Sequence, residues 1–183
     1  MKERGARAYY LWISALVVAL DQATKAAVDR LMGLHETREL IDGLVRLTYV
    51  RNRGAAFGFL SNADLPYQSM LFSILSLVAL LAIAAYAFKL PVTQKWTQVA
   101  LALIMGGAVG NLLDRLWHGF VIDFVDVYWR QHHWPAFNVA DSCISIGVVM
   151  LILELLWPGD AEKTSTEGPA PDGHAMTALP HGE

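Results

Sequence analysis

The sequence predicts an all-α polytopic membrane protein with four transmembrane helices. Of its 183 residues, 55% are apolar and only 17% are charged, whereas about a quarter of the residues are charged in an average soluble domain. Lipid offers the backbone no hydrogen-bond partners, so a membrane span needs about 20 mostly apolar residues in a helix. Four stretches meet this requirement, at about residues 9–28, 65–88, 96–115 and 138–157.

The four spans differ in the charges that they carry. The first is uncharged up to Leu20, the second has no charge, and the third is charged only at its end. The first span is not followed by a small-residue cleavage site, so we expect it to remain in the mature protein. The charged residues within the spans are Asp21, Lys25, Asp114, Arg115, Asp141 and Glu154.

The distribution of lysine and arginine predicts that both termini are cytoplasmic. Three basic residues precede the first span, and Lys89 and Lys95 flank the short loop between the second and third spans. Cytoplasmic loops carry an excess of such residues. The first long loop also contains five arginines, so this orientation rests on the first helix and the short loop. It places residues 29–64 and 116–137 on the outer face of the membrane.

The first outer loop is expected to contain a small β-hairpin. The dipeptide Asp42-Gly43 is a turn signal between two short apolar segments. In the second of these segments Val45, Leu47 and Tyr49 alternate with polar residues. This alternation is typical of a strand with one buried face.

Composition argues against several classes of function. The net charge is −3 and there is no long run of basic residues, so nucleic-acid binding is not expected. The single cysteine, Cys143, excludes an intrachain disulfide and a multi-cysteine metal site, and we assign it no role. From Pro158 onward the chain is polar and rich in small residues. We therefore expect a membrane domain over residues 1–157 and a disordered cytoplasmic tail over residues 158–183.

Polar residues of three spans are predicted to lie at about the same depth, in the outer halves of their helices. Asp21 and Lys25 are one helical turn apart and can neutralise each other. Asn111, Asp114 and Arg115 have the spacing i, i+3 and i+4, so they share one stripe. Ionisable groups inside spans indicate function by default, but interfacial charges that reach the headgroups are the alternative explanation.

The small residues Gly106–Gly110 precede this stripe. Such a surface allows a neighbouring backbone to approach closely. Close packing of another helix explains it, and so does an extended substrate lying against it. We place the substrate there as a hypothesis.

Asp123 and Asp141 are the main candidates for acid–base chemistry. Asp123 lies between Ile122 and Phe124 at the membrane boundary, where partial desolvation favours the protonated carboxyl. Asp141 also has a structural explanation, as an acid in the first turn of a helix with Asn138 as the N-cap. Two carboxyls brought together in a dry site share one proton, as in aspartic proteases. The ionised carboxyl then activates water while the protonated one polarises the amide carbonyl.

Other chemistries have weaker support. Ser142 and Ser145 have no basic residue placed by the sequence to activate them. A metal site is conceivable, but there is no His-Glu-x-x-His helix, and His132-His133 is interpreted as an ordinary loop pair. A small proton-coupled transporter or channel subunit and a structural membrane subunit remain as alternatives. The potential metal ligands are His118, His132, His133, Asp123 and Asp126.

Five sequence blocks carry most of these residues. They are Asp21-Gln22-Ala23-Thr24-Lys25, Arg51-Asn52-Arg53-Gly54-Ala55-Ala56-Phe57-Gly58, Gly106-Gly107-Ala108-Val109-Gly110-Asn111-Leu112-Leu113-Asp114-Arg115, Val121-Ile122-Asp123-Phe124-Val125-Asp126 and Phe137-Asn138-Val139-Ala140-Asp141-Ser142. In this order, and with four spans at these intervals, the chain resembles the bacterial lipoprotein signal peptidases, also called signal peptidase II. The resemblance covers roughly residues 9 to 157.

The resemblance implies an inner-membrane aspartic endopeptidase that removes the signal peptide from prolipoproteins, before their diacylglyceryl-modified cysteine, without metal or cofactor. It also implies a small β cradle in the first outer loop. The expected partners are prolipoproteins, membrane lipid and globomycin-type inhibitors, and we expect a monomer. By motif position, the catalytic pair is Asp123 and Asp141, the residues that line or support the site are Asn52, Gly54, Asn111, Arg115 and Asn138, and the scaffold residues are Asp21, Lys25 and Asp114.

Overall fold

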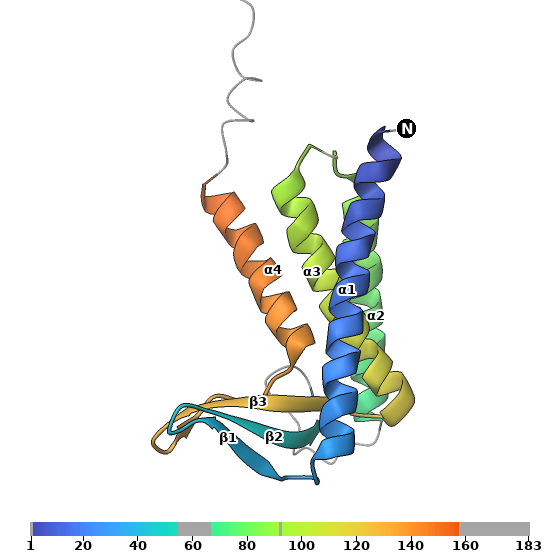
Figure 1. The fold of residues 1–183 in the computed structure, drawn as a ribbon. Coiled ribbons are helices and arrows are strands. Elements are labelled where there is room, and N and C mark those ends of the chain that lie inside the picture. Colours follow the sequence, from blue (N-terminus) through green and yellow to red (C-terminus); the bar gives the residue numbers. More distant parts are fainter. Residues whose placement is uncertain (1, 55–66, 92, 158–183) are drawn as a thin grey trace, which may run out of the picture.

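The computed structural model describes residues 2–54, 67–91 and 93–157 of the chain (Figure 1). Within these ranges it contains four helices and four strands. The helices are α1 (Lys2–Leu31), α2 (Gln68–Lys89), α3 (Lys95–His118) and α4 (Val139–Leu156), and the strands are β1 (Thr37–Ile41), β2 (Val45–Asn52), β3 (Val121–Trp129) and β4 (His132–His133).

All four helices are long and apolar enough to cross a membrane, which confirms the predicted spans. The first span extends to Leu31 and the third runs from Lys95 to His118, whereas the second is Gln68–Lys89 and the fourth is Val139–Leu156. The predicted start of the second span, at residue 65, lies outside the described residues. Helix α3 ends only at Gly119, whose left-handed φ of 75° suits glycine. The third span was predicted to end at Arg115, but Asp114 and Arg115 both lie inside the helix. The predicted tail, residues 158–183, lies outside the described residues.

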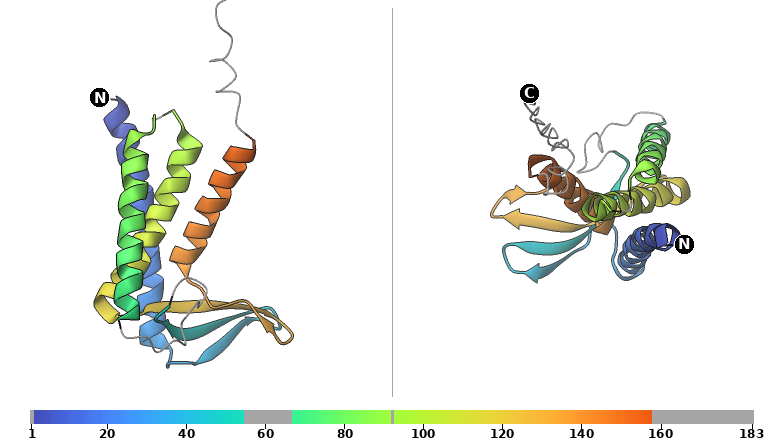
Figure 2. Two further views of the ribbon diagram at one scale, coloured as in Figure 1. Left: turned by 180° about the vertical axis from the view of Figure 1, so that it is seen from behind. Right: turned by 90° about the horizontal axis from the view of Figure 1, so that it is seen from above.

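Helix α3 is the central helix of the bundle. It packs against α1, α2 and α4, with its largest contact on α4. About half of its most apolar 18 residues are buried, 56%, whereas none of the most apolar 18 residues of α2 is. Figure 2 shows α2 at the edge of the bundle, and α4 leans away from the other helices towards its C-terminal end. A polar site at the centre of this fold must therefore be built on α3.

The small residues of α3 are covered by neighbouring helices. A Cβ atom on Gly106 would lie 2.7 Å from Cβ of Val17 in α1. On Gly107 it would clash with the carbonyl oxygen of Ala140 in α4, and on Gly110 it would lie 2.5 Å from a carboxylate oxygen of Asp21. The hypothesis that a substrate backbone lies against this stretch is wrong, because α1 and α4 occupy that surface.

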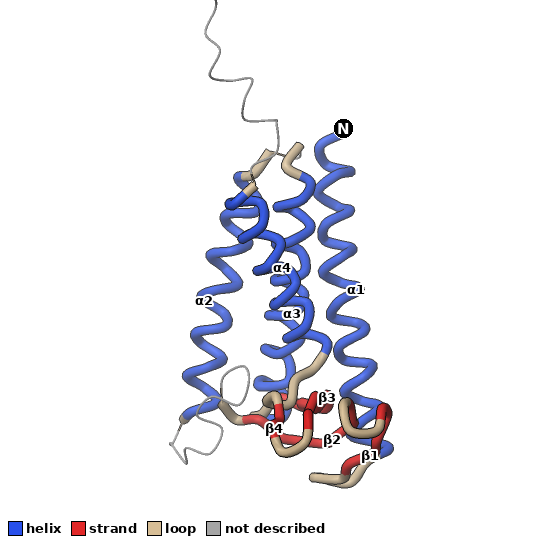
Figure 3. The backbone as a smooth tube through the Cα atoms, turned by 90° about the vertical axis from the view of Figure 1, so that its left-hand side faces the viewer, coloured by secondary structure: helices blue, strands red, loops and turns tan. Residues whose placement is uncertain are grey.

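The strands form one antiparallel sheet in the order β1-β2-β3-β4. The sheet lies across the end of the bundle where α1 and α3 end and α4 begins (Figures 1 and 3). The predicted hairpin is confirmed as β1 and β2, and Gly43 in its turn has a φ of 76°. The sheet is larger than expected, because β3 and β4 come from the second outer loop. The interpretation of His132-His133 as a loop pair is wrong, since these residues pair with Trp129 and Tyr128.

An apolar cluster fixes the sheet to the helices. It contains Val28 and Met32 at the end of α1, Tyr49 of β2, and Ile122 and Phe124 of β3. All five side chains are buried. The cluster therefore holds the first half of β3, including Asp123, close to the ends of α1 and α3.

The close approach of α3 and α4 can be tested at Gly107. We expect Gly107→Ala to destabilise the protein by about 1–2 kcal/mol, because overpacking costs about 1–3 kcal/mol and improved helix propensity offsets only part of it. Thermal unfolding in detergent measures this as a midpoint lowered by several degrees. Gly33→Ala is the matched control, since its new Cβ atom would have its nearest contact at 3.6 Å. Equal midpoints for the two variants would contradict this packing.

Candidate active site

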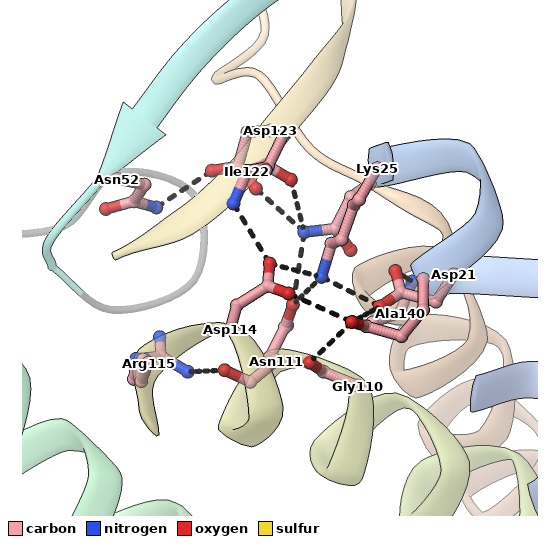
Figure 4. Close-up of polar contacts among 12 residues, drawn as sticks. Asp21, Lys25, Asn52, Gly110, Asn111, Asp114, Arg115, Ile122, Asp123 and Ala140 are labelled. Carbon is pink, nitrogen blue, oxygen red and sulfur yellow. Dashed lines mark hydrogen bonds and ion pairs between the residues drawn. The ribbon is translucent and has the colours of Figure 1, made fainter. Parts of the chain in front are cut away.

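The polar residues singled out in the sequence form one cluster where the helices meet the sheet (Figure 4). They come from α1, α3, the start of α4, β2 and β3. None of the following is more than 7% exposed: Asp21, Lys25, Asn52, Asn111, Asp114, Asp123, Asn138 and Asp141. The structure therefore brings the polar residues of these separate elements together in one buried cluster.

An ion cluster around Lys25 forms the base of the site. Its Nζ lies 2.8 Å from Oδ2 of Asp21 and 3.0 Å from Oδ2 of Asp114, and it donates to Oδ1 of Asn111 at 2.9 Å. An ammonium group has three protons to donate, so these contacts satisfy it. The predicted pairing of Asp21 with Lys25 is confirmed, and Asp114 joins it from α3.

The two acids of this cluster also hold the backbone of other elements. Asp21 accepts a hydrogen bond from the N–H of Ala140 at 3.0 Å, and Asp114 accepts one from the N–H of Ile122 at 3.1 Å. Ala140 and Ile122 directly precede Asp141 and Asp123. The ion cluster therefore positions the backbone next to both candidate catalytic residues.

Gln22 is a further member of the cluster that the sequence analysis did not single out. Its Nε2 donates to Oδ1 of Asp114 at 2.9 Å and to the carbonyl oxygen of Gly110 at 3.2 Å. The available signal was its place three residues before Lys25, which puts both side chains on one face of α1.

Asp123 is held between two asparagine amides. Its Oδ2 accepts a hydrogen bond from Nδ2 of Asn52 at 2.9 Å, and its Oδ1 accepts one from Nδ2 of Asn138 at 2.8 Å. Asp123 pairs with Val50 in the sheet, so Asn52 lies on the same face and reaches it diagonally. Burial and, secondly, the negative charge of Asp141 raise the pKa of Asp123 to about 7. This agrees with the expected preference for the protonated form.

Asp141 has two roles in hydrogen bonding. With Asn138 it forms a capping box at the start of α4: Asn138 Oδ1 accepts from the Asp141 N–H at 2.9 Å, and Asp141 Oδ2 accepts from the Asn138 N–H at 3.3 Å. The other carboxylate oxygen, Oδ1, accepts from Nδ2 of Asn111 at 2.8 Å. The capping explanation for Asp141 is thus correct but incomplete. The side chain of Asn138 thus connects the carboxyl of Asp123 to the backbone N–H of Asp141.

Arg115 connects α3 to the end of β2. Its Nη2 donates to the carbonyl oxygen of Gly54 at 3.1 Å, and its Nη1 donates to that of Asn111 at 3.3 Å. The N–H of Gly54 in turn donates to Oδ1 of Asn52 at 2.8 Å. The buried Nε of Arg115 has no partner among the described residues. All five predicted supporting residues therefore lie in the cluster.

Other candidate groups lie elsewhere. Asp126 contacts Nε of Arg46 at 2.7 Å and Nδ1 of His133 at 3.1 Å, on the sheet. Glu154 accepts a hydrogen bond from Thr97 at 2.6 Å, near the C-terminal end of α4. In the part of the chain that the structure describes, no three His, Cys, Asp or Glu residues are arranged to hold a metal ion.

Comparison with known proteins agrees with this architecture. Residues 13–157 match the family described as "Signal peptidase (SPase) II". This chain belongs to the signal peptidase II family. It is 51% identical over 144 residues to the lipoprotein signal peptidase of Geobacter metallireducens, which covers 79% of this chain and 88% of the relative. It is 42% identical over 177 residues to that of Alteromonas mediterranea, covering 97% of this chain and 95% of the relative.

Two solved structures have the same fold. A bacterial membrane enzyme determined by the in meso method at 2.3 Å resolution superposes with a TM-score of 0.73 and 32% identity, covering 89% of this chain and 93% of that chain. A second, at 1.9 Å resolution, has a TM-score of 0.73 and 31% identity, covering 82% of this chain and 94% of that chain. The chain is thus a multi-pass membrane peptidase, and the transporter alternative has no support from these relatives.

The raised pKa of Asp123 predicts how the stability of this signal peptidase depends on pH. The folded protein keeps a proton that the unfolded chain loses near pH 4, the ordinary range for aspartate. The resulting stabilisation is fully present below about pH 4 and is lost as the pH rises through 7. We expect Asp123→Asn to flatten the fall in thermal midpoint between pH 4 and 7. Asp42→Asn in the β1–β2 turn is the control, and parallel curves for Asp123→Asn and the wild type would contradict the assignment.

The ion cluster predicts a large effect of removing its cation. Lys25→Met leaves the carboxylates of Asp21 and Asp114 buried without their ion partner, which costs about 3–5 kcal/mol. The signal peptidase variant should therefore unfold at a much lower temperature, or fail to accumulate. Lys89→Met, at the exposed end of α2, is the matched control and should have the wild-type midpoint. Similar midpoints for both variants would rule out a structural role for Lys25.

Proposed function

We propose that this signal peptidase is an aspartic endopeptidase that removes the signal peptide from diacylglyceryl-modified prolipoproteins by cleaving before their lipidated cysteine. The observation that carries the proposal is the pair of buried acids, Asp123 and Asp141, both held by Asn138, whose side chain contacts the carboxyl of Asp123 and the backbone N–H of Asp141. Family membership supports the substrate class. The residues that line or support the pair are Asn52, Gly54, Asn111, Arg115 and Asn138, and the scaffold consists of Asp21, Lys25 and Asp114.

In this proposal the two acids have different protonation states. Asp123 carries the shared proton, which its pKa of about 7 favours. Asp141 is ionised, since it lies in the first turn of α4, where the helix dipole stabilises negative charge. The carboxylate of Asp141 takes a proton from water as the water oxygen attacks the scissile carbonyl carbon. The carboxyl of Asp123 donates a hydrogen bond to the carbonyl oxygen.

The tetrahedral intermediate then collapses as the carbon–nitrogen bond breaks. The proton gained by Asp141 passes to the leaving nitrogen, and Asp123 keeps its own proton as the carbonyl re-forms. This chemistry requires neither a covalent enzyme intermediate nor a metal or cofactor. Asn52 and Asn138 orient the carboxyl of Asp123 throughout, and Asn111 orients that of Asp141.

We further propose that the site faces the outer side of the bacterial inner membrane and that both termini are cytoplasmic. The short α2–α3 connection with Lys89 and Lys95, at the end of the bundle opposite the sheet, supports this orientation. Residues 1–157 then form a monomeric peptidase domain in contact with lipid, and residues 158–183 form its cytoplasmic tail. Globomycin-type inhibitors occupy the same site as the substrate.

The catalytic pair is tested by replacing each carboxylate with an amide. We expect Asp123→Asn and Asp141→Asn each to lower cleavage by a factor on the order of 100 to 10,000, the usual contribution of a general acid or base. The measurement is release of the signal peptide from a purified diacylglyceryl-modified prolipoprotein in detergent.

Asp126→Asn is the matched control, because Asp126 lies on the same strand but contacts Arg46 and His133 instead of the site. It should cleave at a rate close to the wild type, and wild-type activity should survive a chelator. Melting curves show that each variant is folded. Normal cleavage by a folded Asp123→Asn or Asp141→Asn variant would remove that residue from the catalytic pair.

A further inference from the structure

A second charged cluster lies outside the candidate active site, where α1 and α3 end at the sheet (Figure 1). It is centred on Arg51 of β2. The Nη2 atom of Arg51 lies 3.9 Å from Oδ1 of Asp29, near the end of α1. Its guanidinium carbon lies 4.7 Å from the centre of the Phe120 ring, just after α3. The candidate spans of these helices end at Leu31 and His118. Arg51 therefore contacts the ends of two candidate membrane spans.

The guanidinium group of Arg51 is held in a fixed orientation. Its Nε donates to the hydroxyl oxygen of Tyr49 at 3.1 Å, and its guanidinium carbon lies 5.3 Å from the centre of the Tyr49 ring. The faces of the Tyr49 and Phe120 rings both attract the cation. The Tyr49 hydroxyl in turn donates to Oδ1 of Asp29. A side chain that is ordered in this way loses little further freedom when it binds a ligand.

Most of the hydrogen-bond donors of this guanidinium group are unused. An arginine side chain has five N–H donors. Among the residues that the structure describes, only Nε of Arg51 makes a hydrogen bond. The contact with Asp29 is too long to be one. Because the Arg51 side chain is also 44% exposed, its Nη1 and Nη2 groups are available to an anion.

Arg38 of β1 shows that exposure alone does not leave an arginine available. Its side chain is 52% exposed. Its Nε donates to Oε1 of Glu36 at 2.7 Å, and its Nη2 donates to the carbonyl oxygen of Leu31 at 2.7 Å. The guanidinium group of Arg38 is therefore already used within the protein, whereas that of Arg51 is ordered and still has free donors.

The surface around Arg51 has the composition of a membrane interface. Leu116 and Trp117, near the end of α3, are 66% and 65% exposed. Tryptophan is enriched where membrane spans reach the headgroups. The last turns of α1 and α3 also contain the basic residues Arg30 and His118. An anionic headgroup would therefore meet basic side chains and, beside them, exposed apolar ones.

We propose that Arg51 binds the phosphate group of a membrane phospholipid in the leaflet next to the sheet. In a membrane the ends of α1 and α3 lie among the headgroups, where phosphate groups carry negative charge. A guanidinium group can donate two parallel hydrogen bonds to phosphate oxygens. The acyl chains then extend past Leu116 into the bilayer, and the lipid holds this end of β2 at the membrane surface. This inference depends on the membrane-spanning fold and not on the proposed function.

The first test measures lipid binding to the full chain in detergent by native mass spectrometry, with dioleoyl phosphatidylglycerol as the probe. Arg51→Gln should weaken binding about fivefold, the contribution of one basic residue at a lipid surface. Arg38→Gln is the matched control and should bind the lipid as the wild type does, because Glu36 and Leu31 already use its donors. Equal lipid affinities of the two variants would overturn the proposal.

Asp29→Asn should have the opposite effect, which keeps the test decisive if Arg51→Gln does not fold. This variant retains an oxygen that can accept from Tyr49, but it removes the negative charge that competes for Arg51. Lipid binding should tighten about twofold to fivefold. Asp42→Asn, in the β1–β2 turn, changes the net charge equally and should leave lipid binding unchanged. Unchanged or weaker binding by a folded Asp29→Asn variant would contradict the role of Arg51.

The wild type alone distinguishes a lipid from a soluble phosphate. Three probes are compared by thermal unfolding: dioleoyl phosphatidylglycerol, dioleoylglycerol without phosphate, and glycerol phosphate without acyl chains. A ligand that binds only the folded protein raises the midpoint, and we expect phosphatidylglycerol to raise it the most. An equal rise with dioleoylglycerol would show that the phosphate is not recognised. An equal rise with glycerol phosphate would indicate a site for soluble phosphates, and either result would overturn the proposal.

Discussion

The buried ammonium of Lys25 is the interaction on which the rest of the site depends. It neutralises Asp21 of its own helix and Asp114 of α3, and these acids in turn hold the backbone N–H groups of Ala140 and Ile122. Two carboxylates without a cation would be unstable at this depth in the protein. One positive charge therefore allows α1, α3, α4 and β3 to meet at a single point.

Asn138 explains how one short segment serves both folding and the proposed chemistry. Its oxygen caps the N-terminus of α4, and its amide group holds the carboxyl of Asp123. The start of α4 and the position of Asp123 are therefore coupled through one side chain. Because the capping box also includes Asp141, the geometry that begins the helix brings both acids to the same asparagine.

Residue spacing predicted those parts of the structure that depend on one helix or one hairpin. The spacing of Asp21 and Lys25 was enough to pair them, because helical periodicity is fixed. Contacts between elements could not be predicted from residue spacing. Gln22 contacts α3 only because α1 is rotated so that this side chain faces α3. Strand β3 was missed because its first four residues are buried on both faces, which removes the alternating pattern. The local sequence explained the small residues around Gly107 equally well by a packed helix and by a bound substrate. Only the structure shows that α4 packs against Gly107.

The position of the site at the end of the bundle suits the proposed chemistry. Burial between the helices and the sheet raises the pKa of Asp123 more than the nearby Lys25 lowers it, so the carboxyl can hold a proton near neutral pH. A fully hydrated aspartate would be ionised there. The raised pKa of Asp123 and the position of the site beside the four apolar helices thus have one structural cause, its place where the bundle meets the sheet.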